Sequence, residues 1–426
     1  MNIEELYTLY LQYPSVQTDT RKLQNGDLFF ALKGPSFNGN AFAQNAINAG
    51  AAYAIIDDGN YAIEGKTILV EDVLTTLQEL ARHHRQQFKI PFIAITGSNG
   101  KTTTKELIHA VLSSTYTTYT TEGNLNNHIG VPLTLLKVKP DAQMAVIEMG
   151  ANHQKEIASY CTYALPTHGL ITNIGKAHLE GFGSEEGVRR GKGELYDHLR
   201  SHNGTAFVMA DYDYLQDMSK GISTLYSYGT QEADVTGDIS QTDPFLEVGF
   251  KKSYEGAIKT NLVGSYNLPN VLAAVAVGKY FGVANEKIKR AIENYTPSNS
   301  RSQLMEKGTN KIILDAYNAN PSSMKAAIEN FAHIKADNKI LALGAMAELG
   351  ENSLQEHAAI VEEIKKYPWQ QVVLVGGDFT KLNHPYQQFH SPQEAGAWIK
   401  DKAKNAYVLI KGSRSMQMEK VLDYLA

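Results

Sequence analysis

The stretch 'FIAITGSNGKTTTKELIHAVL', residues 92–112, joins an apolar run, a glycine-containing loop and an amphipathic segment. The run 'FIAI' predicts a buried strand, and Leu107, Ile108 and Val111 recur on one face of a helix. The loop 'TGSNGKT' between them has the features of a phosphate-binding loop, although Ile95 stands where the usual G-x-x-x-x-G-K-[ST] pattern has its first glycine. Strand, loop and helix in this order predict an α/β domain that binds phosphate groups at the helix N-terminus.

The residue types in this loop suit a nucleotide. Gly97 and Gly100 allow backbone N–H groups to approach phosphate oxygens, and Lys101 adds a positive charge. The Thr102 hydroxyl can be a ligand of a magnesium ion. The alternative is a glycine turn before an ordinary helix, but the strand, the Lys-Thr pair and the helix together favour a phosphate loop.

The composition of the 426 residues is that of a globular protein, and a prior of about 150 residues per domain predicts roughly three domains. The longest apolar run, 'VLAAVAV' at 271–277, is too short to cross a bilayer, and the acidic start 'MNIEELYTLYLQY' has no secretory signal pattern. The single cysteine, Cys161, excludes an intramolecular disulfide framework. We therefore expect a cytoplasmic protein without a membrane span.

The charge balance bears on the partners. There are 40 basic and 45 acidic residues, which gives a formal charge of -5, and no long basic block occurs. This balance argues against nucleic acid as the main partner. Local basic groups can still bind a small anionic substrate.

Three α/β regions follow one another along the chain. Residues 1–86 contain 'GDLFFAL', 'AFAQNAINAGAAYAII' and 'KTILV', which predict a strand, a helix leading into a strand, and a strand. Residues 87–297 add the strands 'MAVIEMG', 'HGLITNIG' and 'TAFVMA', separated by helices, which predicts a mainly parallel sheet. Residues 298–426 repeat the alternation, which predicts a second open, Rossmann-like α/β sheet. The stretch 'RHHRQQFKIP' at 82–91 is interpreted as a linker because Pro91 cannot continue a helix.

Polar side chains follow several strands at the sheet edge where α/β proteins bind ligands. Glu148 ends 'MAVIEMGAN', where a carboxylate could hold magnesium directly or through water. The segment 'ITNIGKAHLEGFGS' brings Asn173, His178 and Glu180 to the same edge. Taken singly, Glu148 could be a solvated acid and His178 a structural histidine. Lys192 lies among glycines at a predicted helix start, where a solvated surface lysine is the alternative.

A second group of polar residues suits a nucleoside. Asn267 and Asn270 in 'GSYNLPNVLAAVAV' precede or open a helix, where one of them could serve as a cap. Arg301 lies near the predicted domain junction, and Asp315 ends a strand with Asn318 three residues further on. Ribose hydroxyls and an adenine edge are suitable partners for these groups.

The order of these motifs resembles the Mur ligase family, the ATP-dependent acid:amino-acid ligases of peptidoglycan precursor synthesis. The resemblance covers nearly the whole chain. Family members share the shortened loop, here 'TGSNGKTTTKE', then a strand-end Glu, a His, an Asn-x-x-Asn pair, an Arg and an Asp in this order. The motifs 'TDTRKLQNGDLFFALKG', 'GNLNNHIGVPLTLL', 'EMGANHQKEI', 'DAYNANPSSM' and 'MAELG' are most similar to the member that adds D-alanyl-D-alanine to UDP-N-acetylmuramoyl-tripeptide.

This resemblance implies an activity and a domain organisation. The γ-phosphoryl group of ATP would pass to the terminal carboxylate of UDP-N-acetylmuramoyl-tripeptide, and the amine of D-alanyl-D-alanine would attack the acyl phosphate. ADP and phosphate would leave. The implied domains are an N-terminal UDP-substrate-binding domain at 1–86, a central ATP-binding domain at 87–297 and a C-terminal Rossmann-like ligase domain at 298–426. A monomer is expected.

The resemblance also implies roles for individual residues. The implied catalytic residues are Lys101, Glu148, His178 and Lys192. Two magnesium ions are implied, with ligands Thr102, Glu148, His178 and Lys192, the last as a carbamate. ATP contacts are implied for Gly97, Ser98, Asn99, Gly100, Lys101, Thr102, Thr103, Asn267, Asn270, Arg301, Asp315 and Asn318. Contacts to the UDP-linked substrate are implied for Asp19, Thr20, Arg21, Lys33, Gly34, Asn126 and Asn127.

Two positions depart from the family pattern. Asn40 stands where relatives often have His, and Ala345 where they often have Asp, which bears on the substrate and dipeptide pockets.

Two kinds of enzyme remain as alternatives. One alternative is another ligase of the superfamily, adding a single amino acid or acting as a folylpolyglutamate synthase; the other is a small-molecule kinase. The segments 'DTR' and 'GDLFFALKG' argue against folate enzymes, which begin directly with the ATP-binding domain. A kinase would leave the third region unexplained.

Overall fold

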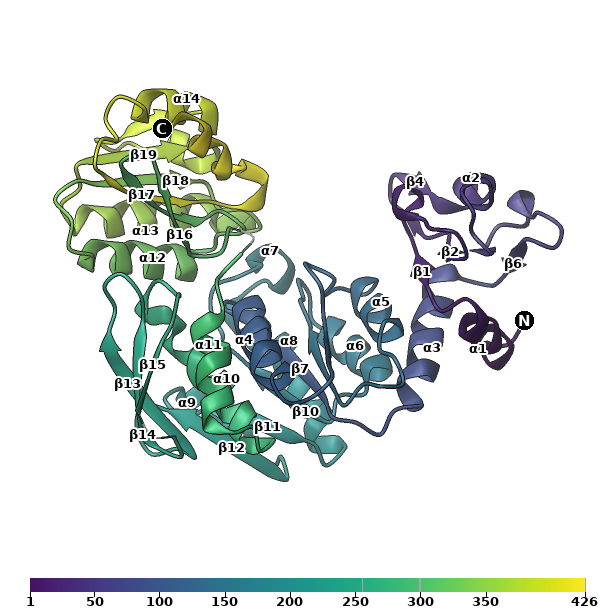
Figure 1. Cartoon of the computed structure of the whole chain (residues 1–426). Coiled ribbons are helices and arrows are strands. Elements are labelled where there is room, and N and C mark those ends of the chain that lie inside the picture. Colours follow the sequence, from purple (N-terminus) through teal and green to yellow (C-terminus); the bar gives the residue numbers. More distant parts are fainter. Residues whose placement is uncertain (255, 299, 426) are drawn as a thin grey trace.

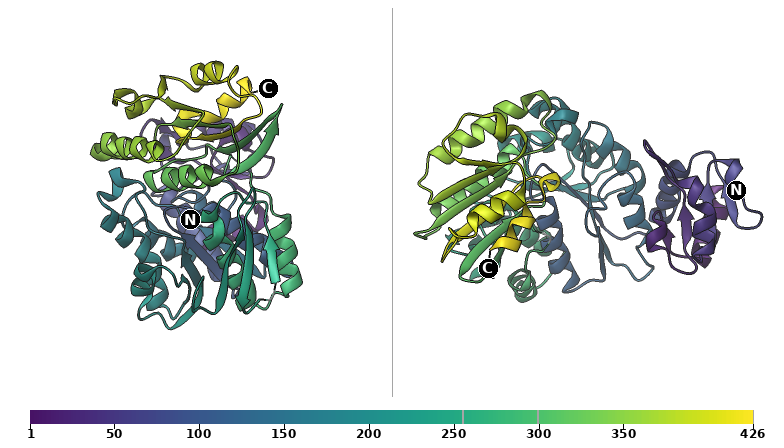
Figure 2. Two further views of the ribbon diagram at one scale, coloured as in Figure 1. Left: turned by 90° about the vertical axis from the view of Figure 1, so that its left-hand side faces the viewer. Right: turned by 90° about the horizontal axis from the view of Figure 1, so that it is seen from above.

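The computed structural model describes residues 1–254, 256–298 and 300–425 and arranges them as three lobes along an arc (Figure 1). The N-terminal lobe lies at one end, the central lobe lies at the bend, and the C-terminal lobe stands over the other side of the central lobe. Seen from above, the N-terminal and C-terminal lobes lie at opposite ends, with the central lobe between them (Figure 2). The predicted α/β architecture is confirmed, because each lobe is built on a sheet of its own.

The N-terminal lobe is a small parallel sheet with the strand order β1-β2-β5-β6. Its strands are β1 (Val16–Gln17), β2 (Leu28–Phe30), β5 (Tyr53–Ile56) and β6 (Thr67–Leu69), with a separate hairpin of β3 (Lys33–Gly34) and β4 (Phe37–Asn38). Its helices are α1 (Ile3–Gln12), α2 (Ala43–Asn48) and α3 (Val73–Gln86). Side chains alternate across β2: Leu28 and Phe30 join the main core with α1 and α3, whereas Phe29 joins a small cluster under α2.

The central lobe is built on a sheet with the order β15-β14-β13-β12-β11-β10-β7-β9-β8. Neighbouring strands are parallel from β13 to β8 and antiparallel from β13 to β15. The bounds are β7 (Phe92–Thr96), β8 (Thr118–Thr120), β9 (Met144–Glu148), β10 (His168–Ile171), β11 (Thr205–Met209), β12 (Thr224–Gly229), β13 (Val235–Gln241), β14 (Glu247–Lys252) and β15 (Gly256–Lys259). Every residue of β7, β9 and β11 is buried, as expected for parallel strands covered on both faces.

Helices cover this sheet and bring the loops that follow the strands to one edge. They are α4 (Lys101–Ser113), α5 (Gly130–Leu136), α6 (Glu156–Ala164), α7 (Leu179–Phe182), α8 (Glu185–Ser201), α9 (Asp213–Ser219), α10 (Leu268–Tyr280) and α11 (Asn285–Asn294). The predicted apolar face of α4 is buried, because Leu107, Ile108 and Val111 are all inaccessible to solvent. The glycine loop therefore lies between a buried strand and a firmly packed helix.

The C-terminal lobe is an open sheet with the order β16-β17-β21-β18-β19-β20, parallel except for β16. Its strands are β16 (Gln303–Lys307), β17 (Asn310–Asp315), β18 (Lys339–Gly344), β19 (Gln371–Val375), β20 (Gln387–Phe389) and β21 (Tyr407–Lys411), and its helices are α12 (Pro321–His333), α13 (Ser353–Lys365) and α14 (Pro392–Ile399). The Asn320 side chain accepts a hydrogen bond from the Ser323 N–H and so caps α12, while Pro321 takes the first helical position. The segment that follows β21 ends in a 3₁₀ helix, Met418–Tyr424, where the sequence predicted an ordinary helix.

The predicted linker at 82–91 is wrong in its first half, because α3 continues to Gln86. Arg85, near the end of that helix, is buried, and its side chain reaches the central lobe. Its Nε and one terminal nitrogen donate to the carbonyls of Ala164 and Leu165 at the C-terminal end of α6, at 3.0 and 2.9 Å. The guanidinium carbon also lies 3.7 Å from the centre of the Phe92 ring. Helix α3 is thus fixed to the central lobe by a cation placed at a helix C-terminus.

Within residues 1–254, 256–298 and 300–425, the helices fall short of the length and apolar character that a membrane span requires.

Replacing Arg85 tests whether this side chain fixes α3 to the central lobe. We expect Arg85→Met to lower the free energy of unfolding by about 2–4 kcal/mol, because two helix-end carbonyls lose a charged donor. Urea denaturation followed by circular dichroism measures the change. Arg82→Met, at an exposed position of the same helix, is the matched control and should change stability by less than about 0.5 kcal/mol. Equal effects of the two substitutions would contradict this role of Arg85.

Candidate active site

The glycine loop leads from β7 into α4 in a backbone conformation that needs glycine. Gly97 has φ +141° and Gly100 has φ +79°. A Cβ atom on Gly97 would lie 2.0 Å from the Thr172 hydroxyl, and one on Gly100 would lie 2.6 Å from the Asn270 side-chain oxygen. Helix α4 begins directly after the loop at Lys101. The loop therefore packs tightly against β10 and α10 and leaves the helix N-terminus open to a phosphate.

Lys101 curls back over this loop. Its Nζ donates to the carbonyls of Gly97 at 2.7 Å and of Ser98 at 3.2 Å. Desolvation in the cleft lowers the pKa of Lys101, and the nearby positive charge of Arg301 acts in the same direction. A bound polyanion would offset both effects, so this ammonium group is placed for a phosphate ligand.

Glu148 lies at the end of β9 and is 1% exposed, so it is not a solvated strand-end acid. Its Oε1 accepts hydrogen bonds from the Thr102 hydroxyl at 3.2 Å and from the Asn126 amide at 2.7 Å. Its Oε2 is buried and has no hydrogen-bond partner among the described residues. A buried carboxylate oxygen left in this state is costly unless a cation or donor approaches it.

Lys192 lies in the middle of α8 rather than at the predicted helix start. It is fully buried, which excludes the alternative of a solvated surface lysine. Its Nζ donates to the Ala151 carbonyl at 2.9 Å and lies 5.0 Å from the centre of the Phe182 ring. Burial lowers the pKa of Lys192 well below its ordinary value, and the positive charge of Lys101 contributes. The amine is therefore far more easily neutralised than a surface lysine.

His178 precedes α7 and lines the cleft, with a left-handed backbone at φ +53°. Its Nδ1 lies 2.5 Å from Oε2 of Glu348, a residue of the C-terminal lobe. The two atoms are in contact, but the geometry at Nδ1 does not meet the criteria of a hydrogen bond. This contact holds the pKa of the Glu348 carboxyl group below its usual range.

The two asparagines at the start of α10 do not act as caps. The Asn267 side chain makes no capping bond and instead accepts from the Asn270 amide at 2.9 Å. The Asn270 oxygen in turn accepts from the Thr104 hydroxyl of α4 at 2.9 Å. Both asparagines are buried side chains on the cleft wall, so the capping alternative is wrong for each.

The C-terminal lobe contributes a charged group on the facing wall. The Arg301 guanidinium carbon lies 3.7 Å from the centre of the Tyr317 ring, a stacking that fixes the side chain's direction. Asp315, at the end of β17, forms an ion pair with the buried Lys411 of β21, with 2.6 Å between Nζ and Oδ2. The Lys411 Nζ also donates to the Asn318 carbonyl at 3.3 Å.

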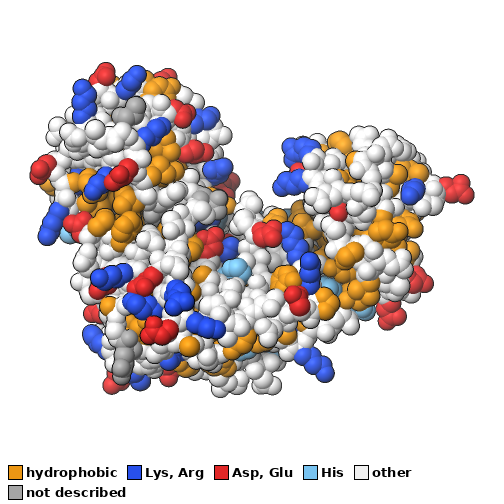
Figure 3. Space-filling model, in the orientation of Figure 1, with side chains coloured by type: hydrophobic (Ala, Val, Ile, Leu, Met, Phe, Trp, Pro, Cys, Tyr) orange, Lys and Arg blue, Asp and Glu red, His pale blue; other side chains and the backbone are white. Residues whose placement is uncertain are grey.

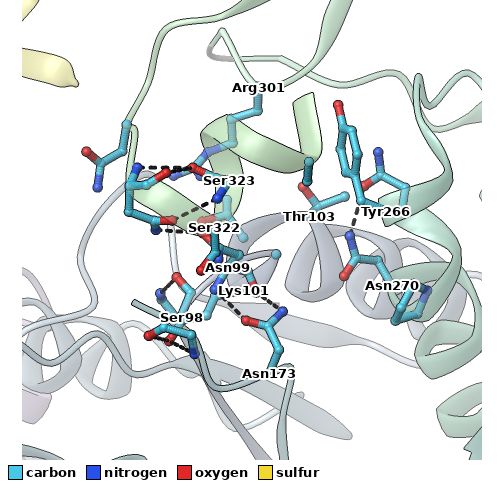
Figure 4. Close-up of a pocket in the computed structure, with 18 of the residues that line it drawn as sticks. Ser98, Asn99, Lys101, Thr103, Asn173, Tyr266, Asn270, Arg301, Ser322 and Ser323 are labelled. Carbon is cyan, nitrogen blue, oxygen red and sulfur yellow. Dashed lines mark hydrogen bonds between the residues drawn. The ribbon is translucent and has the colours of Figure 1, made fainter. Parts of the chain in front are cut away.

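Polar contacts join the central and C-terminal lobes beside the glycine loop. The Asn320 amide donates to the Asn99 side-chain oxygen at 2.8 Å. The Lys176 backbone N–H donates to the Ser322 hydroxyl at 3.3 Å, and its Nζ pairs with Glu356 at 2.6 Å. Figure 4 shows Ser322 and Ser323 next to Ser98, Asn99 and Lys101. The structure is thus a state in which the C-terminal lobe contacts the phosphate loop.

These walls enclose a cleft of about 1500 Å³. Most of the predicted site residues line it: Ser98, Asn99, Gly100, Lys101, Thr102, Thr103, Asn126, Asn127, Glu148, His178, Asn267, Asn270, Arg301, Asp315 and Asn318. Gly97 and Lys192 are not among the lining residues of the cleft; they lie behind residues that line it. Asn173 also lines it and accepts from the Asn99 N–H at 3.0 Å.

The predicted substrate residues of the N-terminal lobe do not line this cleft. Arg21 pairs with Asp19 at 2.7 Å, and Lys33 pairs with Asp57 at 2.8 Å. The space-filling view shows an open hollow between this lobe and the C-terminal lobe, above the central lobe (Figure 3). Thr20 and Gly34 lie beside these pairs in the same lobe. A molecule in contact with both the cleft and these residues would have to be long.

The two departures from the family pattern occupy structural positions. Asn40 is fully buried; its amide donates to Asp57 at 2.8 Å, and its oxygen accepts from the Asp57 N–H at 3.0 Å. Ala345 is also buried and continues the backbone hydrogen bonds between β18 and β19 through Val375. Asn40 therefore supports the carboxylate that pairs with Lys33.

Within the described ranges, no three His, Cys, Asp or Glu side chains are grouped so that they could hold a metal ion by themselves. A divalent ion here would depend on other oxygens: the Thr102 hydroxyl, a modified Lys192, and the phosphates of a nucleotide. The unpartnered Oε2 of buried Glu148 fits such an ion.

Reasoning from the sequence missed the residues that act across lobes and the buried lysine of the C-terminal wall. Glu348 lies in 'MAELG', a motif noted for its resemblance but given no role, and Lys411 is the last residue of β21, in 'LIKGSRS'. A strand-end position is the signal that could have identified Lys411. Lys176, Glu356 and Ser322 carry no local signal, because their partners lie far away in the sequence.

Comparisons with known proteins agree with this arrangement. Family models match three parts of the chain: the Mur ligase family catalytic domain at 12–85, the Mur ligase middle domain at 95–278, and the Mur ligase glutamate ligase domain at 300–414. The UDP-N-acetylmuramoyl-tripeptide--D-alanyl-D-alanine ligase of Bacillus subtilis is 35% identical, over 96% of this chain and 92% of the relative.

Solved structures are similar over the same length. The crystal structure of MurF from Acinetobacter baumannii has a TM-score of 0.88 at 31% identity and covers 96% of this chain and 93% of its own. MurF ligase from Thermotoga maritima in complex with ADP has a TM-score of 0.86 at 26% identity and covers 97% of both chains.

The tight fit of the glycine loop gives a test of the nucleotide site. We expect Gly97→Ala to weaken ADP binding by about 10- to 100-fold, since the added methyl group displaces the loop from Thr172. Isothermal titration calorimetry measures the Kd. Gly282→Ala is the control: φ is +74° there too, but nothing lies within 4 Å of the added Cβ. A similar loss of affinity in both variants would mean that backbone strain, and not the loop contact, is responsible.

Proposed function

This chain belongs to the Mur ligase family, and we propose that it joins D-alanyl-D-alanine to UDP-N-acetylmuramoyl-tripeptide at the expense of ATP. The observation that carries this function is the 35% identity to a ligase of that name across nearly the full length of both chains. All three lobes take part in the match, including the N-terminal one. The enzyme is thus an ATP-dependent ligase of peptidoglycan precursor synthesis.

The reaction proceeds by carboxylate activation. A carboxylate oxygen of the tripeptide attacks the γ-phosphorus of ATP, the bond to the β-phosphate oxygen breaks, and ADP leaves with that electron pair. The dipeptide amine then attacks the carbonyl carbon of the acyl phosphate. The C–O bond breaks, phosphate leaves, and the nitrogen loses a proton to give the amide.

The chain's own residues hold ATP for the first step. The loop N–H groups and Lys101 would contact the β- and γ-phosphates, where the negative charge shifts during transfer. Asn267 and Asn270 would face the adenine, and Arg301, Asp315 and Asn318 the remaining nucleotide groups from the C-terminal lobe. The cleft lining and the cation of Arg301 support these assignments.

Two magnesium ions would be held by Thr102, Glu148, His178 and Lys192. Thr102 and Glu148 are already joined by a hydrogen bond, and the free buried Oε2 of Glu148 supports an ion beside it. When bound, magnesium offsets the charge of the phosphates. Lys101 and the loop supply the remaining positive charge from the protein.

Lys192 would take part as a carbamate. Its amine adds to carbon dioxide, an N–C bond forms, and a proton leaves the nitrogen, so that an anionic oxygen ligand replaces a cation. The reaction needs a neutral amine, and full burial next to Lys101 favours that form. The position of its Nζ at the Ala151 carbonyl, just beyond β9, supports a place beside Glu148.

The UDP end of the substrate would be held far from the phosphate loop. Asp19, Thr20, Arg21, Lys33 and Gly34 lie in the N-terminal lobe, while Asn126 and Asn127 line the central cleft. A UDP-linked tripeptide is an extended molecule, and one that contacted both sites would cross the hollow of Figure 3. A cytoplasmic location and a monomeric state remain predictions.

An assay of ADP release distinguishes this function from its alternatives. With UDP-N-acetylmuramoyl-tripeptide and ATP, adding D-alanyl-D-alanine should raise ADP release by more than about tenfold, because the acyl phosphate cannot discharge to an amine without it. Coupled detection of ADP and mass spectrometry of the product measure this. Turnover indifferent to the dipeptide would favour a kinase, and a preference for a folate with glutamate or for single amino acids would favour another ligase.

Lys192 can be tested through its modification. We expect Lys192→Ala to lower kcat by more than about 100-fold, and added acetate or formate to restore part of the activity by supplying the missing carboxylate oxygen. Wild-type enzyme in ¹³C-bicarbonate should show one carbamate carbon signal that Lys192→Ala lacks. Lys155→Ala, an exposed lysine on the neighbouring loop, is the control and should respond to neither acid. Full activity of Lys192→Ala, or a carbamate signal that survives it, would contradict the assignment.

A further inference from the structure

One contact between the lobes involves a residue of the proposed metal site. His178, from the loop before α7, and Glu348, from the loop after β18, approach to 2.5 Å between Nδ1 and Oε2. The same loops share a backbone hydrogen bond from the Glu180 N–H to the Glu348 carbonyl, at 3.2 Å. Gly350 packs closely enough that a Cβ there would lie 3.4 Å from the Glu180 Cα. The two loops therefore meet along backbone as well as side chain.

Both residues of this pair have left-handed backbones. His178 has φ +53° and Glu348 has φ +62°. Such angles are unfavourable for residues with a Cβ and persist where the surroundings determine them. Here two facing loops each hold an ionisable side chain, that of His178 or Glu348, in this conformation. The geometry brings a carboxylate to one particular nitrogen of the imidazole.

The identity of that nitrogen matters chemically. A neutral imidazole carries its proton on one ring nitrogen, and a carboxylate partner selects the nitrogen that it faces. With the proton on Nδ1, the lone pair of His178 is on Nε2. Because His178 lines the cleft, Nε2 is then the nitrogen available to a ligand there.

We propose that Glu348 is a positioning residue, brought by the C-terminal lobe, which fixes the ring orientation and tautomer of His178. The inference rests on the proposed function for the role of His178, and it makes closure of the lobes a condition for a complete site. The terminal torsion of Glu348 is soft enough to turn the carboxylate into line with the Nδ1–H.

A competing role for Glu348 is recognition of the incoming dipeptide. Its side chain is 46% exposed, so its carboxylate could also meet an ammonium group. The two roles differ in what they change. A positioning role acts on kcat, on the magnesium requirement and on the state of the His178 ring. A recognition role acts on the KM for D-alanyl-D-alanine.

The experiment compares Glu348→Ala and Glu348→Gln with Glu356→Gln. Glu356 pairs with Lys176 across the same two lobes without touching His178, so it controls for loss of a closing contact. Glutamine at 348 keeps an acceptor oxygen near Nδ1 but removes the charge. The ¹⁵N signals of the His178 ring, assigned with His178→Gln among the 13 histidines, are recorded without nucleotide and with a non-hydrolysable ATP analogue and magnesium.

With the analogue bound, wild type and Glu356→Gln should show His178 protonated on Nδ1, and Glu348→Ala should move the proton to Nε2. We expect kcat of Glu348→Ala to fall by about 10- to 100-fold, with a higher magnesium requirement, an unchanged KM for the dipeptide, and partial rescue in Glu348→Gln. An identical His178 spectrum in wild type and Glu348→Ala under both conditions would overturn the proposal, as would an effect confined to the dipeptide KM. The ¹⁵N spectrum of the His178 ring does not depend on which amide the enzyme forms. A failure of the proposed reaction would therefore be seen in the ADP-release assay and not in this spectrum.

Discussion

The arrangement of this molecule depends on bringing two anions together. A carboxylate must approach the γ-phosphate of ATP, and two unit negative charges about 4 Å apart repel by roughly 4 kcal/mol at an effective dielectric constant of 20. On the proposed assignments, the groups that would offset this repulsion are the N–H groups of the glycine loop, Lys101 on the central lobe and Arg301 on the C-terminal lobe. The lowered pKa of Lys101 is caused first by desolvation and then by the charge of Arg301, while Glu148 and Glu348 act in the opposite direction. A bound polyanion would therefore stabilise the charged form of Lys101.

Burial divides the charged residues of the site into two kinds. The buried Lys411 pairs with the partly exposed Asp315, so the two form a fixed part of the C-terminal wall. Glu148 and Lys192 lack such compensation among the described residues: one Glu148 oxygen has no hydrogen-bond partner, and the Lys192 amine contacts the Ala151 carbonyl and the Phe182 ring but forms no ion pair. An uncompensated buried acid and a readily neutralised buried amine are the groups that a metal ion and a carbamate would complete.

The fold was predictable wherever it depends on local patterns. The strand 'FIAI', the glycine turn and the apolar face of α4 are adjacent in sequence, and each follows from its own residues. Lys192 was placed at a helix start because of the glycines beside it, whereas α8 begins at Glu185 and includes them. Its burial depends on contacts with Phe182 and Ala151, which the helix sequence does not reveal. The break assigned at Arg82 failed for the same reason, since α3 continues where Arg85 finds carbonyls on another helix. Contacts between lobes, such as that of His178 with Glu348, could not be predicted, because no local sequence pattern indicates them.

Four residues with a left-handed backbone lie at the junction of the central and C-terminal lobes. Besides His178 and Glu348, Ser300 and Ser302 on either side of Arg301 have positive φ angles, +56° and +48°. Each such residue costs of the order of 1–3 kcal/mol, which the rest of the structure has to offset. The contacts that hold the lobes together beside the loop are polar, such as Asn99 with Asn320 and Lys176 with Glu356. A ligand that binds to both lobes at once favours their contact by its own binding free energy. On the proposed assignments ATP would be such a ligand, with its phosphates at the central loop and Arg301 on the other wall. Contact between the lobes would then exclude water from an acyl phosphate that water could hydrolyse.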